Sequence, residues 1–206
     1  MRSVLQTTSV VIMLAAGAAR AEDNGKLGIF VESRVGGAFP GLFNRLRVAP
    51  TFALEGGALF ALDQHLGAVF EISYAQPRSS RTVEDARLTT GGKYNATLTM
   101  RDLGLFAGGK WLFPSLAQRL TPYVEAGVRV HFIDTIVQGS AGADFGQNDE
   151  TSPQWGAALR VGASYALGPG ALSLTVEAAY AEVAQVVTGA SNISNILTQL
   201  GYGLNF

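Results

Sequence analysis

Charged side chains stand at alternate positions inside otherwise apolar segments of this chain. Glu32 and Arg34 are one such pair, and Glu125 and Arg129 share one phase in a later segment. Because residues two apart lie on one face of a β-strand, these groups are expected on the polar faces of strands. Six acids and four bases follow this pattern, namely Glu32, Arg34, Glu55, Glu71, Asp102, Lys110, Glu125, Arg129, Arg160 and Glu177. Their near-balance in charge predicts an ion-pair and hydrogen-bond network.

The sequence lacks the patterns that would indicate metal or nucleotide chemistry. It has no cysteine, and His65 and His131 are its only histidines. No HExxH motif, P-loop or pair of histidines at metal-ligand spacing occurs. We therefore predict no cofactor, no metal site and no catalytic residues. The net charge of −1 also gives no indication of a nucleic-acid partner.

The elements that would position the charged residues are eight alternating segments. Hydrophobic residues make up 48% of the chain and charged residues only 15%, against about 25% in an average protein. No apolar run is long enough for a membrane helix, so the apolar residues are accommodated by alternation. The segments are 27–35, 51–62, 66–75, 96–113, 122–132, 154–167, 171–180 and 196–206.

The N-terminus has the features of an export signal. Met1-Arg2 is a basic start, residues 10–19 are apolar, and Ala19-Arg20-Ala21 is a cleavage site of small residues. The apolar run is too short to cross a bilayer core of about 30 Å. We therefore predict a cleaved signal peptide at 1–21 and a single domain at 22–206.

The connections between the segments alternate in length. The short ones are 63–65, 114–121 and 168–170, and the long polar ones are 36–50, 76–95, 133–153 and 181–195. Short turns at one end and long loops at the other are typical of outer-membrane β-barrels, whose turns lie in the periplasm. Eight strands that close into a barrel also leave no unpaired edge.

The last segment carries a terminal motif. Gln199, Gly201, Leu204 and Phe206 fill the pattern polar–x–Gly–x–x–apolar–x–aromatic at the end of the chain. This resembles the closing strand of bacterial outer-membrane β-barrels, and the strand rhythm resembles the OmpA/OmpX-like eight-stranded barrel family. The resemblance implies an all-β, eight-stranded antiparallel up-and-down transmembrane β-barrel. It also implies insertion into the outer membrane by the barrel-assembly machinery, which reads this motif in that family.

Aromatic residues near both ends of the segments favour an apolar exterior. They are Phe52, Tyr74, Phe132, Trp155 and Tyr180 on the loop side, and Phe60, Trp111, Phe113 and Phe206 on the turn side. Such girdles mark membrane interfaces, so the apolar faces would meet lipid and the polar faces would fill a narrow interior. The alternative is a secreted, soluble calyx with its apolar face inside and an apolar ligand.

Three functions are open to such a barrel. A filled polar interior favours a non-catalytic structural or surface-interaction protein. The alternatives are a narrow, porin-like channel for ions or small solutes and a lipid A-modifying enzyme. Outer-membrane lipid A deacylases place a serine two residues after the catalytic histidine, but Ile133 follows His131 at that spacing. Ser140 could act as a nucleophile only if the loops brought it to the histidine.

The long connections differ in the sign of their charge. Residues 76–95 carry Arg78, Arg81 and Arg87, whereas 133–153 is acidic. Because guanidinium groups bind phosphate well, we expect the basic connection to contact lipopolysaccharide. The expected partners are therefore outer-membrane lipid, lipopolysaccharide and, during insertion, the barrel-assembly machinery.

Overall fold

The computed structural model describes residues 28–39, 49–59, 65–84, 93–116, 119–140, 144–185, 189–192 and 194–206, and most of these residues form antiparallel β-strands. The strands are β1 (Gly28–Ala38), β2 (Ala49–Leu59), β3 (Leu66–Ala75), β4 (Arg78–Glu84), β5 (Lys93–Leu112), β6 (Leu120–Ser140), β7 (Asp144–Leu167), β8 (Gly170–Gln185), β9 (Gly189–Asn192) and β10 (Asn195–Asn205). None of the described residues forms a helix long and apolar enough to cross a membrane. The expected signal peptide, 1–21, lies outside the described residues.

The ten strands align as eight. β4 continues β3, because both pair with β5 in one register, with Ala75 opposite Asp102 and Arg78 opposite Thr99. Pro77 interrupts the ladder between them because it has no backbone N–H. β9 leads into β10 in the same way, since both pair with β8 in one register.

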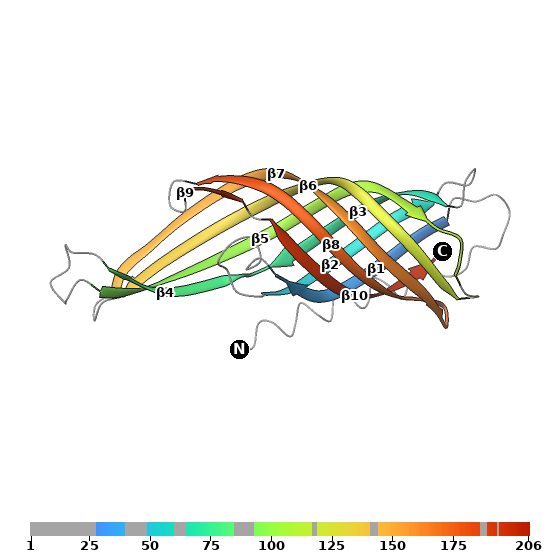
Figure 1. Cartoon of the computed structure of the whole chain (residues 1–206), viewed down its shortest axis with the longest axis horizontal. Helices are drawn as coiled ribbons and strands as arrows, with labels where there is room; N and C mark the ends of the chain where they lie inside the picture. Colours follow the sequence, from blue (N-terminus) through green and yellow to red (C-terminus); the bar gives the residue numbers. More distant parts are fainter. Residues whose placement is uncertain are drawn as a thin grey trace.

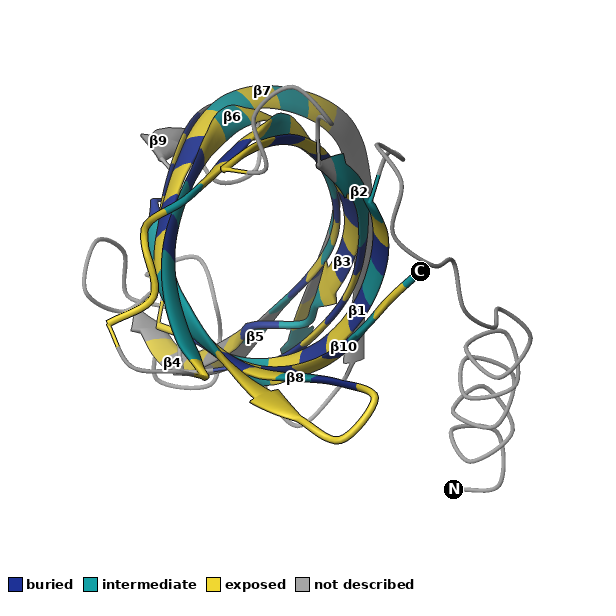
Figure 2. Cartoon of the chain, turned by 90° about the vertical axis from the view of Figure 1, so that its right-hand side faces the viewer, coloured by how far each residue is buried: buried dark blue, intermediate teal, exposed yellow. Residues whose placement is uncertain are grey.

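The sheet closes on itself into a barrel. β1 pairs with β2 on one side and with β10 on the other, so the first and last strands are neighbours. Strands consecutive in sequence are paired around the rest of the wall, and the view along the barrel axis shows a ring (Figure 2). The predicted eight-stranded antiparallel up-and-down β-barrel is confirmed.

At one end, the strands extend well beyond the expected positions. β6 continues to Ser140 and β7 begins at Asp144, so most of the loop predicted at 133–153 is a paired hairpin. The loop predictions at 76–95 and 181–195 were also wrong where β4, the start of β5, the end of β8 and β9 lie. A strand outside the lipid needs no apolar face, so these segments have the composition of loops although their backbones are paired. Figure 1 shows the hairpins extending from this end.

Alternate residues along each strand face opposite sides of the wall, as the colours in Figure 2 show. Ile29, Val128 and Leu174 are about half exposed, at 50%, 52% and 54%, whereas Glu55 and Arg160 are 0% exposed. The polar face therefore points inward and the apolar face outward. A soluble calyx requires the reverse orientation, which excludes that alternative.

Glycines in the wall make room for the few large rings inside the barrel. Phe106 is fully buried in one apolar cluster with Phe30 and Val69. A Cβ atom at Gly108 would lie 2.7 Å from the Phe106 ring, and one at Gly127 would lie 2.8 Å from it. These two positions therefore have to be glycine for a narrow barrel to hold a phenylalanine between its walls.

Candidate functional site

Arg160, on β7, is the centre of the barrel interior. Its Nη1 atom lies 3.0 Å from Glu55 Oε2 and 3.1 Å from Glu125 Oε2. Its Nη2 atom lies 2.6 Å from Glu71 Oε1, and its Nε atom lies 2.5 Å from Glu177 Oε2. The four carboxylates belong to β2, β6, β3 and β8, so one side chain ties together five strands.

Arg34, on β1, is the second centre and shares three carboxylates with Arg160, namely Glu55, Glu71 and Glu125. Its Nη2 atom lies 2.8 Å from Glu55 Oε1, and its Nη1 atom lies 3.3 Å from Glu71 Oε2. Its Nε atom lies 2.7 Å from Glu32 Oε1. Glu55 and Glu71 therefore each offer one oxygen to each arginine, which links β1 to β7 through the middle of the barrel.

Lys110, on β5, binds the same group of carboxylates from another side. Its Nζ atom lies 2.9 Å from Glu125 Oε1 and 3.3 Å from Glu55 Oε1. It also lies 4.6 Å from the centre of the Phe30 ring and 4.3 Å from that of Tyr123. At these distances the ring faces attract the ammonium group, so the aromatic side chains support the ion pairs.

Arg129, on β6, completes the set of buried bases. It donates to Glu177 Oε1 through Nη1 and to the hydroxyl of Ser73 through Nη2. On another part of the wall, the hydroxyl of Ser173 donates to Glu32 Oε1. Neutral hydroxyl groups thus form hydrogen bonds with donor and acceptor atoms of the charged side chains that have no charged partner.

The paired interior charges are five carboxylates and four bases. Their side chains are at most 8% exposed, and each of them is in at least one ion pair. They are Glu32, Glu55, Glu71, Glu125 and Glu177 with Arg34, Lys110, Arg129 and Arg160. Buried charges are tolerated only when they are paired and hydrogen-bonded. The interior is therefore a single cross-braced network.

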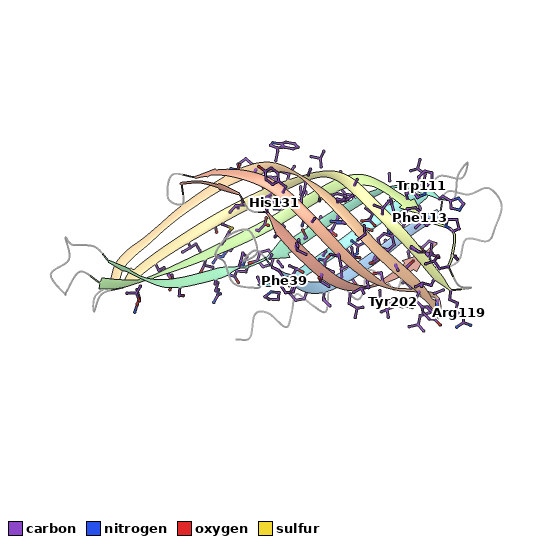
Figure 3. The ribbon with its side chains drawn as sticks, viewed as in Figure 1. Phe39, Trp111, Phe113, Arg119, His131 and Tyr202 are labelled. Atoms are coloured by element: carbon purple, nitrogen blue, oxygen red, sulfur yellow. The ribbon has the colours of Figure 1, made fainter. Side chains whose placement is uncertain are left out.

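Asp102 lies apart from that network, although the sequence pattern placed it on the same face. Its Oδ2 atom lies 2.9 Å from Nδ1 of His131, and its side chain is 14% exposed. Met100 and Ile133 are the next inward residues on the same two strands, and they form an apolar cluster with Ala181. On β5 and β6 the inner face thus changes from charged to apolar beyond the Asp102–His131 pair, toward the hairpins; Figure 3 labels His131.

Among the described side chains, His131 is paired with Asp102, and no serine follows it at the spacing of the deacylases. His131 is 1% exposed, and Ile133, two residues further on, is fully buried. The side chain of Ser140 lies outside the described part, and His65 is exposed in a turn before β3. The described residues contain no group of three or more side chains suited to holding a metal ion.

β10 places the terminal motif at the seam where the barrel closes. Gln199 and Gly201 face the interior, whereas Leu204 and Phe206 are half-buried. The backbone N–H of Phe206 donates to the carbonyl of Ile29 at 2.8 Å. The end of the chain is therefore paired with the start of β1.

Exposed aromatic residues encircle the outer wall near both ends. Phe52 is opposite Tyr74, Tyr74 is opposite Leu103, and Leu103 is opposite Phe132, and all four are exposed. Trp155 and Tyr180 are also exposed on the same side of the barrel, and Phe60 lies outside the described residues. Near the other end, Figure 3 labels Trp111, Phe113 and Tyr202.

A closed barrel with a charged interior, an apolar wall and two aromatic girdles belongs to one class. The chain is a transmembrane β-barrel of the outer-membrane type. In barrels of this type the short connections lie in the periplasm and the long ones at the cell surface, so we expect the strand-built hairpins at the outer end.

No family model matches the chain, and no curated protein matches it in sequence. Solved structures of similar fold include Neisserial surface protein A, at 14% identity and a TM-score of 0.47 over 89% of this chain and 98% of that one. The attachment invasion locus protein Ail of Yersinia pestis has 14% identity and a TM-score of 0.44, over 88% and 99%. A major outer membrane protein of Thermus thermophilus has 15% identity and a TM-score of 0.48, over 87% and 99%.

The sequence reasoning missed neutral side chains that take part in the network. Tyr123 is two residues before Glu125, and Ser73 is two residues after Glu71, so both lie on the charged faces. The hydroxyl oxygen of Tyr123 lies 2.5 Å from that of Thr175. The alternation that located the charges also places these residues on the inner face, but a neutral hydroxyl group gives no charge signal in the sequence.

The basic residues expected to contact lipopolysaccharide are described only in part. Arg78 is exposed on β4. Arg81 is also on β4, but its side chain lies outside the described part, and the whole of Arg87 lies outside it. The sequence reasoning missed Arg101, on β5, whose Nη1 atom lies 3.2 Å from Asp134 Oδ2 on the outer surface.

Proposed function

We propose that this protein is a non-catalytic outer-membrane barrel with a sealed interior that presents strand-built hairpins at the cell surface. The observation that carries the proposal is the burial of the interior charges. Arg160, Glu55 and Glu125 are 0% exposed at the middle of the barrel. An ion path needs continuous water, and these side chains occupy the place where the water would be.

The geometry also makes opening costly. Arg160 bonds to carboxylates on four other strands, and Arg34 shares three of them. A passage through the barrel would separate several ion pairs at once and leave charges buried without partners. A polar interior of this kind serves to pair the buried side chains of a narrow barrel with one another rather than to conduct.

The outer hairpins supply the surface for interaction. β4–β5, β6–β7 and β8–β9 extend past the aromatic girdle that contains Tyr74 and Phe132. Because their backbones are paired, these hairpins form a framework of strands at this end of the barrel, which flexible loops would not.

Conductance in planar bilayers tests the sealed interior. We expect no resolved current steps from the full chain. The double variant E55A/R160A removes two side chains that meet across the barrel, and we expect it to show steps. Retention of heat-modifiable migration on a detergent gel verifies that both proteins are folded. Steps from the unaltered protein would favour the narrow-channel alternative instead.

A further inference from the structure

Two arginines on neighbouring strands lie just beyond the outer aromatic girdle. Tyr74 and Leu103 are directly paired and exposed. Arg101 is two residues beyond Leu103, and Arg78 is four residues beyond Tyr74, so alternation places both arginines on the same outward face. Both are exposed, and Arg78 is paired in register with Thr99, two residues from Arg101. The two guanidinium groups therefore lie in one small patch on the outer face of the wall.

The polarity of the outward face changes at this patch. On β3 and β5 the outward residues below it include Ile72, Tyr74 and Leu103, which are all exposed hydrophobic groups. The patch itself consists of Arg78 and Arg101, and the next outward residues are the polar Thr99 and Ser80. This change marks the level at which the hydrocarbon core ends and lipid headgroups begin.

Arg101 forms one ion pair among the described residues, and this pair uses only its Nη1 atom. Its Nη1 atom binds Asp134 at 3.2 Å, with side chains 51% and 30% exposed. An exposed pair of this kind is weak, so it orients the guanidinium without neutralising its attraction for a stronger anion. Among the described residues, no carboxylate forms an ion pair with Arg78.

We propose that Arg78 and Arg101 bind the phosphate groups of an anionic glycolipid of the lipid A class in the outer leaflet. Guanidinium groups suit phosphate because they donate two parallel hydrogen bonds. The apolar wall directly below the arginines accepts acyl chains at Ile72, Tyr74 and Leu103, which a soluble phosphate does not have. The site therefore combines headgroup and chain recognition. It depends on the outer-membrane location but not on the sealed interior.

Native mass spectrometry of the full chain in detergent micelles tests the site, with bis-phosphorylated lipid A as the probe. We expect R78Q/R101Q to weaken binding roughly fivefold for each arginine removed at low ionic strength. D134N is expected to strengthen binding, because it frees Arg101. The matched control is R119Q, which removes an exposed arginine from the connection at the opposite end.

Three further arms make the result decisive. Lipid A with the same acyl chains but no phosphate should bind the unaltered protein no better than it binds R78Q/R101Q. R78K/R101K should bind with intermediate affinity, because it retains charge but loses paired donors. Inorganic pyrophosphate should not displace the lipid. Equal loss in R119Q, no loss in R78Q/R101Q, or displacement by pyrophosphate would each overturn the proposal, and none of these outcomes depends on conductance.

Discussion

Arg160 and Glu55 are 105 positions apart in the sequence, and their side chains meet at 3.0 Å in the middle of the barrel. They come from β7 and β2, which lie on opposite sides of the ring of eight. This contact spans the interior, and it joins the two carboxylate-sharing arginines into one network. The stability of the barrel should therefore depend on it strongly.

Replacing Arg160 by methionine should destabilise the barrel by about 3–5 kcal/mol, because it leaves buried carboxylates without their common partner. Urea unfolding in lipid vesicles, followed by the fluorescence of Trp111 and Trp155, measures the change. The matched control is Leu159→Ile, at the lipid-facing neighbour, which should cost less than about 1.5 kcal/mol. Similar unfolding of both variants would mean that the network contributes little.

Lys110 and Glu125 should be energetically coupled. They lie 2.9 Å apart, and each side chain is nearly inaccessible. In a double-mutant cycle with Lys110→Met and Glu125→Gln, the loss of unfolding free energy in the double variant should differ from the sum of the two single losses by about 0.5–3 kcal/mol. The same cycle with Lys110→Met and Thr198→Ser, a position on the outer face, should be additive. Additive losses in the first cycle would contradict the described ion pair.

Gly201→Ala should impair the barrel, because the interior offers no space for a methyl group there. The added Cβ would lie 2.6 Å from Ser173 Oγ and 2.9 Å from Arg34 Cγ. Overpacking of this kind costs about 1–3 kcal/mol. Gly109→Ala is the control, since its nearest neighbour would be a backbone oxygen at 3.9 Å. The midpoint of heat modifiability on gels should fall for the first variant and stay unchanged for the second.

Cysteine labelling of intact cells should reveal the orientation. The chain has no cysteine, so Thr82→Cys on β4 and Ser115→Cys after β5 introduce single thiols at exposed positions. A membrane-impermeant maleimide should label the first in intact cells and the second only after the outer membrane is permeabilised. The opposite pattern would place the strand-built hairpins in the periplasm.

We propose that the terminal motif acts in assembly as well as in closure. Phe206→Ala should lower the amount of barrel in the outer membrane of cells, while the purified chain still refolds in detergent. Phe206→Tyr, which keeps an aromatic ring, should restore the amount in cells. Loss of refolding in detergent by Phe206→Ala would show instead that the ring serves folding alone.

The sequence was sufficient to predict the number of strands, the sides of the wall and the type of barrel. Each of these depends on local alternation: Glu125 and Arg129 share a face because they are four residues apart on one strand. The same local signal failed beyond the girdle, where 133–153 lacks a sustained alternation of apolar and polar residues although β6 and β7 pair there. Alternation of apolar and polar residues arises where one face of a strand contacts lipid. A strand that extends beyond the lipid therefore does not show this alternation.

Only the tertiary structure decided which charges meet. Glu71 lies between Arg34 and Arg160, whereas Asp102, on the same kind of face, binds His131 instead. These partners depend on the register between strands and on the diameter of the closed ring. Both are properties of the whole barrel, because they are set by all its strands together. Alternation along one strand contains no information about the opposite wall, so the sequence pattern determined the faces and closure of the barrel determined the pairs.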